Sequence, residues 1–348
     1  MKWSYLPVIA VPLLLGWQAA PRQSAYAGAK ACAACHAQIY RRQQNSHHAR
    51  SLRAVEAAPE VTALLPFTFQ DRASAATLRL ERADAPFVDL SAQKGSELRR
   101  LRLQWAFGSG VKAITMIGLR EDGKHVEGRL TWYRSLGSFD LTTGATRHTP
   151  ANILESVGRE LTGDEVRKCF ECHTTGDTPQ VPLQAGAETG IHCESCHGPG
   201  REHIQAVTRR PVGEKKISHP GRLDGFAQAR MCGTCHGEPP EDTDIAGIRA
   251  IETNPNTVRF ASPRLVLSRC FNESDQKLKC TTCHNPHEDA AQAAAQSDRT
   301  CLSCHTKEVR RKAAVCKVTR YKCASCHMPR ERVVAHSSFA DHWIRVIK

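Results

Sequence analysis

Residues 280–305 read CTTCHNPHEDAAQAAAQSDRTCLSCH, a stretch that begins and ends with the motif C-x-x-C-H. The 348-residue chain contains seven copies of this motif, which use 14 of its 16 cysteines. Histidine makes up about 5% of the chain, so its chance occurrence after all seven C-x-x-C pairs is on the order of one in a billion. The copies are Cys32-Cys35-His36, Cys169-Cys172-His173, Cys193-Cys196-His197, Cys232-Cys235-His236, Cys280-Cys283-His284, Cys301-Cys304-His305 and Cys323-Cys326-His327.

C-x-x-C-H is the attachment signature of c-type haem. A zinc ribbon would explain the cysteine pairs but requires no adjacent histidine each time, and a thioredoxin-like redox pair would occur once, in a βαβ setting. In haem attachment, the two thiols bond to the two vinyl groups of one haem and the following histidine binds iron. The sequence therefore predicts seven covalently bound haem c groups, with the fourteen motif cysteines as attachment sites and the seven motif histidines as proximal iron ligands.

Ten further histidines are available as second iron ligands, and seven would be needed if every iron had two histidines. His192 directly precedes Cys193, and His287 lies three residues after His284, so both are good candidates. Met116, Met231 and Met328 could also bind iron, but Met328 adjoins His327 and is better read as packing against the haem. The count permits full coordination and equally permits one open iron.

The composition predicts few ordinary core residues. Hydrophobic residues make up 41% of the chain including the cysteines, and about 36% without them, which is low for a globular protein. Because each haem is a large apolar body, we expect mostly short α-helices and irregular loops wrapped around haems, with a small antiparallel β insert. The expected helices are residues 37–45, 156–168 and 290–296.

Four segments are predicted along the chain: a signal peptide (1–27), an N-terminal haem segment (28–64), a strand-rich haem-free insert (65–150) and a six-haem domain (151–348). Within the insert, apolar and polar residues alternate over 101–107, and 77–81 forms another short strand. Residues 114–119 and 126–133 flank an Asp-Gly turn, which predicts a hairpin. We expect the insert to cover the haems, with a platform for a substrate or partner as the alternative.

The first 27 residues predict export. Lys2 precedes a short apolar stretch over 6–17, and Ala25-Tyr26-Ala27 supplies a cleavage site. A buried helix or a retained anchor are the alternatives, but Pro7 and Pro12 disfavour a helix. No apolar run reaches the ~18–20 residues that a transmembrane helix needs. We therefore expect a periplasmic or extracellular protein with no transmembrane segment in the mature chain.

Two cysteines, Cys270 and Cys316, lie outside the motifs. In an oxidising compartment such a pair most simply forms a disulfide. Two free thiols or an intermolecular bridge are the alternatives, because sequence does not fix the separation of the two Cα atoms.

The motifs resemble multihaem c-type cytochromes of the cytochrome c-554 family. The resemblance rests on the first block with Tyr40 and Ser46–Arg50, on Ile191–Gly200 with His203, on Cys280–His287, and on the closing Cys323–Pro329 with the tail His336–Trp343. The chain departs from the four-haem type by its seven motifs and by the insert. The resemblance implies distal iron ligands at His48, His192, His203, His287, His336 and His342, with His148 weaker.

Family members are chiefly electron carriers, so the resemblance implies an electron-transfer relay between redox partners such as other cytochromes or a membrane quinol-oxidising module. The alternative is an oxidoreductase acting on a small nitrogen or sulfur oxyanion, or on peroxide, at one open iron; catalytic residues for it are unknown. The absence of a C-x-x-C-K motif weakens that alternative. A structural or polymerising cytochrome is a third class, and the oligomeric state is left open.

The charge raises the question of nucleic acid, because the formal net charge is +13. Each oxidised haem carries two negative propionates and one positive charge at its ferric iron, which gives a net charge of −1. Seven oxidised haems therefore offset about seven positive charges. We therefore predict no nucleic-acid partner.

Overall fold

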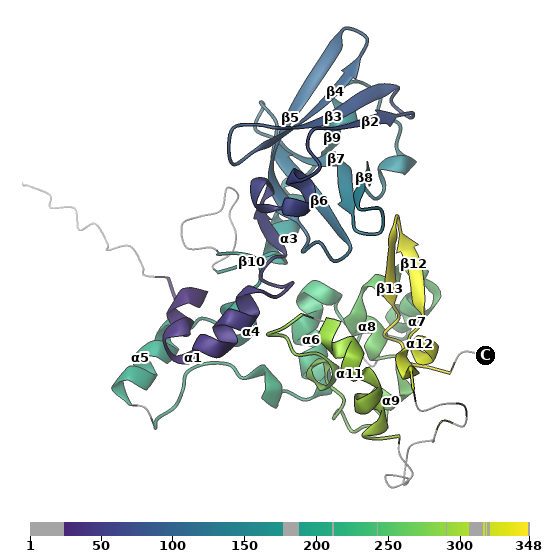
Figure 1. Ribbon diagram of the computed structural model, residues 1–348. Helices are drawn as coiled ribbons and strands as arrows, with labels where there is room; N and C mark the ends of the chain where they lie inside the picture. Colours follow the sequence, from purple (N-terminus) through teal and green to yellow (C-terminus); the bar gives the residue numbers. More distant parts are fainter. Residues whose placement is uncertain are drawn as a thin grey trace, which may run out of the picture.

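The structure is a computed structural model that describes residues 24–176, 188–210, 212–241, 243–289, 291–305, 316, 318 and 321–346. Figure 1 shows a β-sheet formed by the first half of the chain, and a region of helices and loops formed mainly by the second half. Residues 1–23 of the predicted signal peptide lie outside the described residues. Within the described ranges, no helix has both the length and the apolar character that crossing a bilayer requires.

One antiparallel sheet of nine strands dominates the first region. Strands β2 to β8 are neighbours in chain order, while the short strands β1 and β9 pair with β5 and β7. The strands are β1 (Leu52–Ala54), β2 (Phe67–Asp71), β3 (Ala76–Arg82), β4 (Val88–Lys94), β5 (Glu97–Phe107), β6 (Ala113–Leu119), β7 (His125–Tyr133), β8 (Ser138–Leu141) and β9 (Gly158–Glu160).

The strands predicted from alternation are present. In β5, Leu101 and Leu103 are buried while Arg102 between them is exposed. Strands β6 and β7 form the predicted hairpin, and its turn contains Gly123 at φ 81°, a backbone conformation that glycine adopts without steric cost. The predicted strand over 77–81 lies within β3.

Apolar side chains from successive strands form a conventional core. Because side chains alternate across a strand, every second residue of β3, β4 and β5 points to the same face. Leu78, Leu80, Leu90, Leu101 and Leu103 are fully buried there. Val55 and Val61, from the segment that joins β1 to β2, pack into the same cluster.

The predicted fold class is therefore wrong, because it underestimated the β-sheet. We expected a small β insert in a mostly helical chain, but the sheet has nine strands and extends from Leu52 to Glu160, beyond both ends of the expected insert at 65–150. The physical reason is that composition averages over the whole chain. The apolar residues are concentrated in this region, so it needs no haem to supply its interior.

Short helices make up most of the remaining regular structure. Residues 37–45 and 290–296 were expected to be helical, and they lie largely within α1 and α11. The described α-helices are α1 (Ala29–Gln44), α2 (Pro59–Thr62), α3 (Gly163–Glu171), α4 (Cys193–His197), α5 (Arg201–Arg209), α6 (Gly225–His236), α7 (Ile245–Thr253), α8 (Ala261–Leu265), α9 (Arg269–Asn272), α10 (Cys280–Cys283), α11 (Ala291–Leu302) and α12 (Cys323–His327). Single 3₁₀ turns are η1 (Val55–Ala57), η2 (Ala145–Arg147), η3 (Glu155–Val157), η4 (Pro220–Arg222) and η5 (Pro255–Arg259).

The helix expected over 156–168 begins later than predicted. Residues 158–160 form β9, and α3 starts only at Gly163. The Thr162 side chain accepts a hydrogen bond from the Glu165 backbone, and the Glu165 carboxylate accepts one from the Thr162 backbone in return. This capping box satisfies two amide groups at the start of the helix, which fixes the boundary.

A C-terminal hairpin, β12 (Arg330–Val334) and β13 (Ser337–Ala340), joins the two regions. Figure 1 shows it rising from the helical region toward the sheet near β8. Lys112 donates a hydrogen bond to the Ser338 carbonyl at 2.8 Å, and Ser135 donates one to the His336 carbonyl at 2.6 Å. These contacts fix the end of the chain against the loops beside β6 and β7.

Candidate metal centres

The C-x-x-C-H motifs lie on helical segments. Helices α4 and α12 consist of the third and seventh motifs, α10 carries the cysteines of the fifth, and α6 ends with the fourth. One helical turn separates the two cysteines of a motif, so both lie on the same side of the helix. At the first motif, α1 departs from helical geometry at His36, where φ is −117° and ψ is 37°.

Three motif histidines each face a second histidine from a distant part of the chain. The ring centroids are 6.0 Å apart for His48 and His236, 6.2 Å for His197 and His287, and 6.2 Å for His284 and His342. In every pair, one member is a predicted proximal ligand and the other a predicted distal candidate.

These separations provide a test of whether the residues fit a haem iron. Imidazole nitrogens bind transition metals at about 2 Å, and the ring centroid lies about 1 Å behind the nitrogen, so two rings on opposite sides of one iron have centroids about 6 Å apart. Ordinary contacts between rings cover about 4.5–7 Å, so the spacing is compatible with a shared iron without being specific to it. The three pairs match the spacing of two ligands on one iron, and the residues therefore fit the group.

The other ring nitrogen of several histidines is held by the backbone. A carbonyl only accepts hydrogen bonds, so Nδ1 must donate, which leaves Nε2 as the nitrogen that binds metal. Metal-binding histidines typically have this second contact, because it fixes the orientation of the ring. The contacts are His173 to Ser51 (2.9 Å), His197 to Ser218 (3.0 Å), His327 to Arg345 (2.9 Å), His203 to Lys215 (2.6 Å) and His342 to Ala340 (3.1 Å).

Three predicted distal candidates have Nε2 against a protein oxygen instead. Nε2 of His148 lies 3.0 Å from the Glu155 carboxylate, and Nε2 of His336 lies 2.7 Å from the Asp140 carboxylate. His192 contacts the Thr189 carbonyl through Nε2 at 2.9 Å. The structure thus separates these three from His48, His287 and His342, which face a motif histidine.

Desolvation keeps four of the paired rings neutral. Desolvation lowers the pKa of His284, His287 and His342, and it lowers the pKa of His236 to about 4, with His48 contributing. A ring with a pKa below its usual 6.5 is neutral at pH 7. The neutral form is the one that binds iron.

Contacts between cysteines bring different motifs together. A hydrogen bond with Cys193 and burial raise the pKa of Cys32, so the first and third motifs are adjacent. A hydrogen bond from Cys172 lowers the pKa of Cys235 to about 6, which places the second motif beside the fourth. Two further hydrogen-bonded pairs link the fourth motif to the fifth and the sixth to the seventh: Cys232 with Cys280, and Cys301 with Cys323.

A cavity of about 510 Å³ lies beside the first motif helix. Tyr40, Arg50, Arg53 and His192 are among its lining residues. Nε of Arg50 and Nε of Arg53 are buried, and no described residue is within hydrogen-bonding distance of either. Both guanidinium groups pair with carboxylates through their other nitrogens, Arg50 with Asp289 at 3.4 Å and Arg53 with Glu60 at 2.7 Å, and Glu188 also lines the cavity.

The two remaining cysteines are not joined in the structure. The disulfide between Cys270 and Cys316 therefore stays a prediction. Burial raises the pKa of Cys270, and Cys304 of the sixth motif contributes to the shift. Cys270 therefore lies near a haem-attachment motif.

A buried group that the sequence analysis did not single out is Arg264 in α8. Its side chain is 3% exposed and forms an ion pair with Asp341, which is fully buried. For Asp341, the sequence predicted only that it belongs to the C-terminal tail, residues 336–343. No periodicity or motif marks Arg264, because its partner lies 77 residues away.

Two family models match parts of the chain. Residues 137–198, which contain the second and third motifs, match the family described as cytochrome c554 and c-prime. Residues 274–310, which contain the fifth and sixth, match a model described as a doubled CXXCH motif. These matches confirm the resemblance that the motifs predicted.

A curated relative is similar to about half of the chain. The multiheme cytochrome MtrA of Shewanella baltica (strain OS185) is 24% identical over 175 residues, which cover 49% of this chain and 41% of the relative. The match therefore spans less than half of the relative's length. No solved structure matches the chain significantly.

Proposed function

We propose, from the premise that this chain is a multihaem c-type cytochrome, that it carries seven covalent c haems and relays electrons between redox partners. The attachment residues would be the cysteines of the seven motifs, and the proximal ligands their histidines. When bound, each haem iron supplies one-electron oxidation and reduction. The chain's own residues hold, orient and space these groups.

The three paired histidines are the observation that carries this proposal. The ring centroids of His48, His287 and His342 lie 6.0, 6.2 and 6.2 Å from the ring centroid of a motif histidine. We assign these three as distal ligands. An iron with two histidines has no open position for a substrate, and this ligation is typical of electron transfer. His203, whose Nδ1 is held by the Lys215 carbonyl, is a further distal candidate.

Contacts between motifs support a relay rather than isolated sites. The cysteine contacts link the first motif to the third, the second to the fourth, the fourth to the fifth and the sixth to the seventh. Electrostatic contact between Cys283 and Cys301 links the fifth to the sixth. The His197–His287 pair joins the third to the fifth. All seven motifs thus belong to one connected series.

Protein groups would also set the properties of the sites. The backbone carbonyls that bind Nδ1 of His173, His197 and His327 make these rings better electron donors to a metal. Desolvation lowers the pKa of His236, His284, His287 and His342 and so keeps these rings neutral. Both effects favour a stable ligand set over repeated cycles of oxidation and reduction.

Export through a cleaved signal peptide and a periplasmic or extracellular location are part of the proposal. Attachment of c haems and the apolar stretch at residues 6–17 support them. The partners would be other cytochromes or a membrane quinol-oxidising module, which donate and accept electrons.

Haem content and iron coordination test the proposal together. Pyridine haemochrome analysis of the purified holoprotein should return about seven haems per chain. Electron paramagnetic resonance of the oxidised protein should show mainly low-spin iron, and reversible titration with dithionite and ferricyanide should cover all haems. A haem content near zero contradicts the proposal. Rapid binding of cyanide by most of the irons contradicts the relay assignment.

A further inference from the structure

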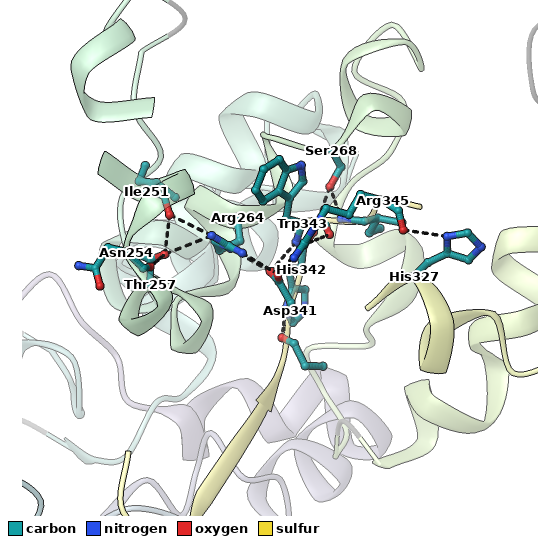
Figure 2. A network of polar contacts seen from close by, with 12 residues as sticks. Ile251, Asn254, Thr257, Arg264, Ser268, His327, Asp341, His342, Trp343 and Arg345 are labelled. Carbon is teal, nitrogen blue, oxygen red and sulfur yellow. Dashed lines mark hydrogen bonds and ion pairs between the residues drawn. The ribbon is translucent and has the colours of Figure 1, made fainter. Parts of the chain in front are cut away.

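The C-terminal segment contains a buried cluster of charges, shown in Figure 2. Arg264 Nε donates to Asp341 Oδ1 at 2.9 Å, and Arg264 Nη2 donates to Oδ2 at 2.6 Å. Arg345 Nη1 donates to the same Oδ2 at 2.6 Å. The Trp343 ring contacts both guanidinium groups, at 5.1 Å for Arg264 and 4.5 Å for Arg345.

The cluster ties separate elements to the end of the chain. Arg264 in α8 also donates to the Ile251 carbonyl in α7 at 2.9 Å. Ser268, which is fully buried, donates to the His342 carbonyl at 3.0 Å and accepts from the Ile344 amide at 2.8 Å. Burying charges costs free energy even when they are paired, and apolar residues often hold two segments together equally well. Attachment of the C-terminal segment alone therefore does not require this cluster.

Two iron-ligand histidines depend on this cluster for their position. His342 directly follows Asp341 and faces His284 at 6.2 Å. On the other side, the Arg345 backbone carbonyl accepts the hydrogen bond from Nδ1 of His327 at 2.9 Å. One is a distal candidate and the other belongs to the seventh motif, so the cluster lies between two different haem sites.

We propose that Asp341 is a shared positioning residue for two haem sites, and that it orients His342 directly and His327 through the Arg345 carbonyl. This inference rests on the proposed function, because it takes both histidines as iron ligands. The Asp341 carboxylate fixes residues 341–345 against α8. This short segment contains His342 and also the Arg345 carbonyl that holds His327. Loss of the carboxylate should therefore disturb two irons together and leave the others unchanged.

The test replaces the carboxylate by its neutral isostere in the holoprotein. In Asp341→Asn, two low-spin ferric signals should shift in the electron paramagnetic resonance spectrum, and one more iron per chain than in the wild type should bind cyanide, because His342 is less firmly held. The potentials of the same two haems should rise, since a negative charge near them is removed. The remaining signals should not move.

The sheet provides a matched control. Asp71 pairs with Arg129 at 2.6 Å, with side chains 1% and 3% exposed, nearly identical to the Arg264–Asp341 pair. Asp71→Asn should lower stability and change no iron signal. If Asp341→Asn likewise lowers stability without changing any iron signal, Asp341 has only a structural role and the inference is wrong.

A milder variant covers the case in which Asp341→Asn does not fold. Ser268→Ala removes the hydroxyl that holds the backbone of His342 and Ile344, and it leaves every charge in place. It should shift the same two signals by a smaller amount. Unchanged signals in a folded Ser268→Ala protein with full haem content contradict the inference, whereas loss of haem from the wild type would contradict the proposed function itself.

Discussion

The sheet and the motif-bearing region bury very different interiors. Among the described residues, residues 52–160 contain most of the fully buried apolar side chains, including Leu78, Leu90 and Leu103. The described residues from 161 to 346, a longer stretch, include only seven buried apolar side chains: Leu161, Val166, Phe170, Ala229, Val258, Leu265 and Phe271. One region is thus stabilised by its own side chains, while the other lacks enough apolar surface to fold by the same means.

This difference predicts that haem contributes to folding in the second region and not in the sheet. The six haems predicted at the motifs of residues 161–346 would supply the interior that this region lacks. The sheet needs none of them, because its strands bury leucines and valines against each other. The chain therefore combines two kinds of stability, and each can be removed separately.

Production without haem should have the largest effect. Expressed where no haem attachment takes place, the chain should keep the sheet and lose the ordered structure of residues 161–346. Hydrogen exchange should show protected amides in β3 to β7 and rapid exchange in the motif helices. Equal protection in both regions would contradict the comparison, since it would mean that the helical region folds without cofactor.

A cavity in the sheet core should give the opposite result. Leu103→Ala removes a fully buried side chain, which costs about 2–5 kcal/mol. Chemical unfolding followed by far-ultraviolet circular dichroism should show this loss for the sheet, while the haem absorption spectrum stays that of the wild type. The exposed neighbour Arg102→Ala is the control and should cost much less.

Acid should weaken the sheet through a single buried pair. Hydrogen bonds from Arg129 and Ser74 lower the pKa of Asp71 against the opposing effect of its burial. A carboxyl with a lowered folded pKa stabilises the protein above its unfolded pKa of about 3.9, and that stabilisation is lost as the pH falls through the folded value. Sheet stability measured between pH 6 and 2 should fall below about pH 4, and this fall should be smaller in Asp71→Asn.

Removal of a single distal ligand should have the smallest effect on stability and should change the coordination of one iron. His287→Ala removes the ring that faces His197, so one low-spin iron should become high-spin or bind cyanide. His336→Ala is the matched control, because Nε2 of His336 contacts Asp140. The control should leave every iron signal unchanged and cost about 1 kcal/mol or less; a lost low-spin signal would instead make His336 a ligand.

Sequence alone predicted the parts of the fold that depend on short-range patterns. The C-x-x-C-H motifs needed only five consecutive residues, and β5 and the β6–β7 hairpin showed alternation and an Asp-Gly turn. The strands β1 and β9 were missed because each has three residues, too few for a period to be recognised. They form only because β5 and β7 offer edges for pairing.

Candidate ligands could be named from sequence, but their pairing could not. His48 faces His236 across 188 positions of the chain, and nothing local to either residue indicates the other. The sequence made His336 and His192 distal-ligand candidates just as it did His287. In the structure, however, Nε2 of His336 contacts Asp140 and Nε2 of His192 contacts Thr189. Which rings face each other depends on the packing of loops, and no periodicity records it.

If each histidine pair binds one iron, as proposed, the pairs would also set an order for biogenesis. A chain that emerges from its N-terminus presents His48 before the fourth motif, so that site is complete as soon as His236 appears. On this assignment the third motif would wait for His287, and the fifth would wait for His342, which lies two residues after the last strand ends at Ala340. Because attachment uses only the cysteines of a motif, each haem would bond to the chain before its distal ligand completes the site.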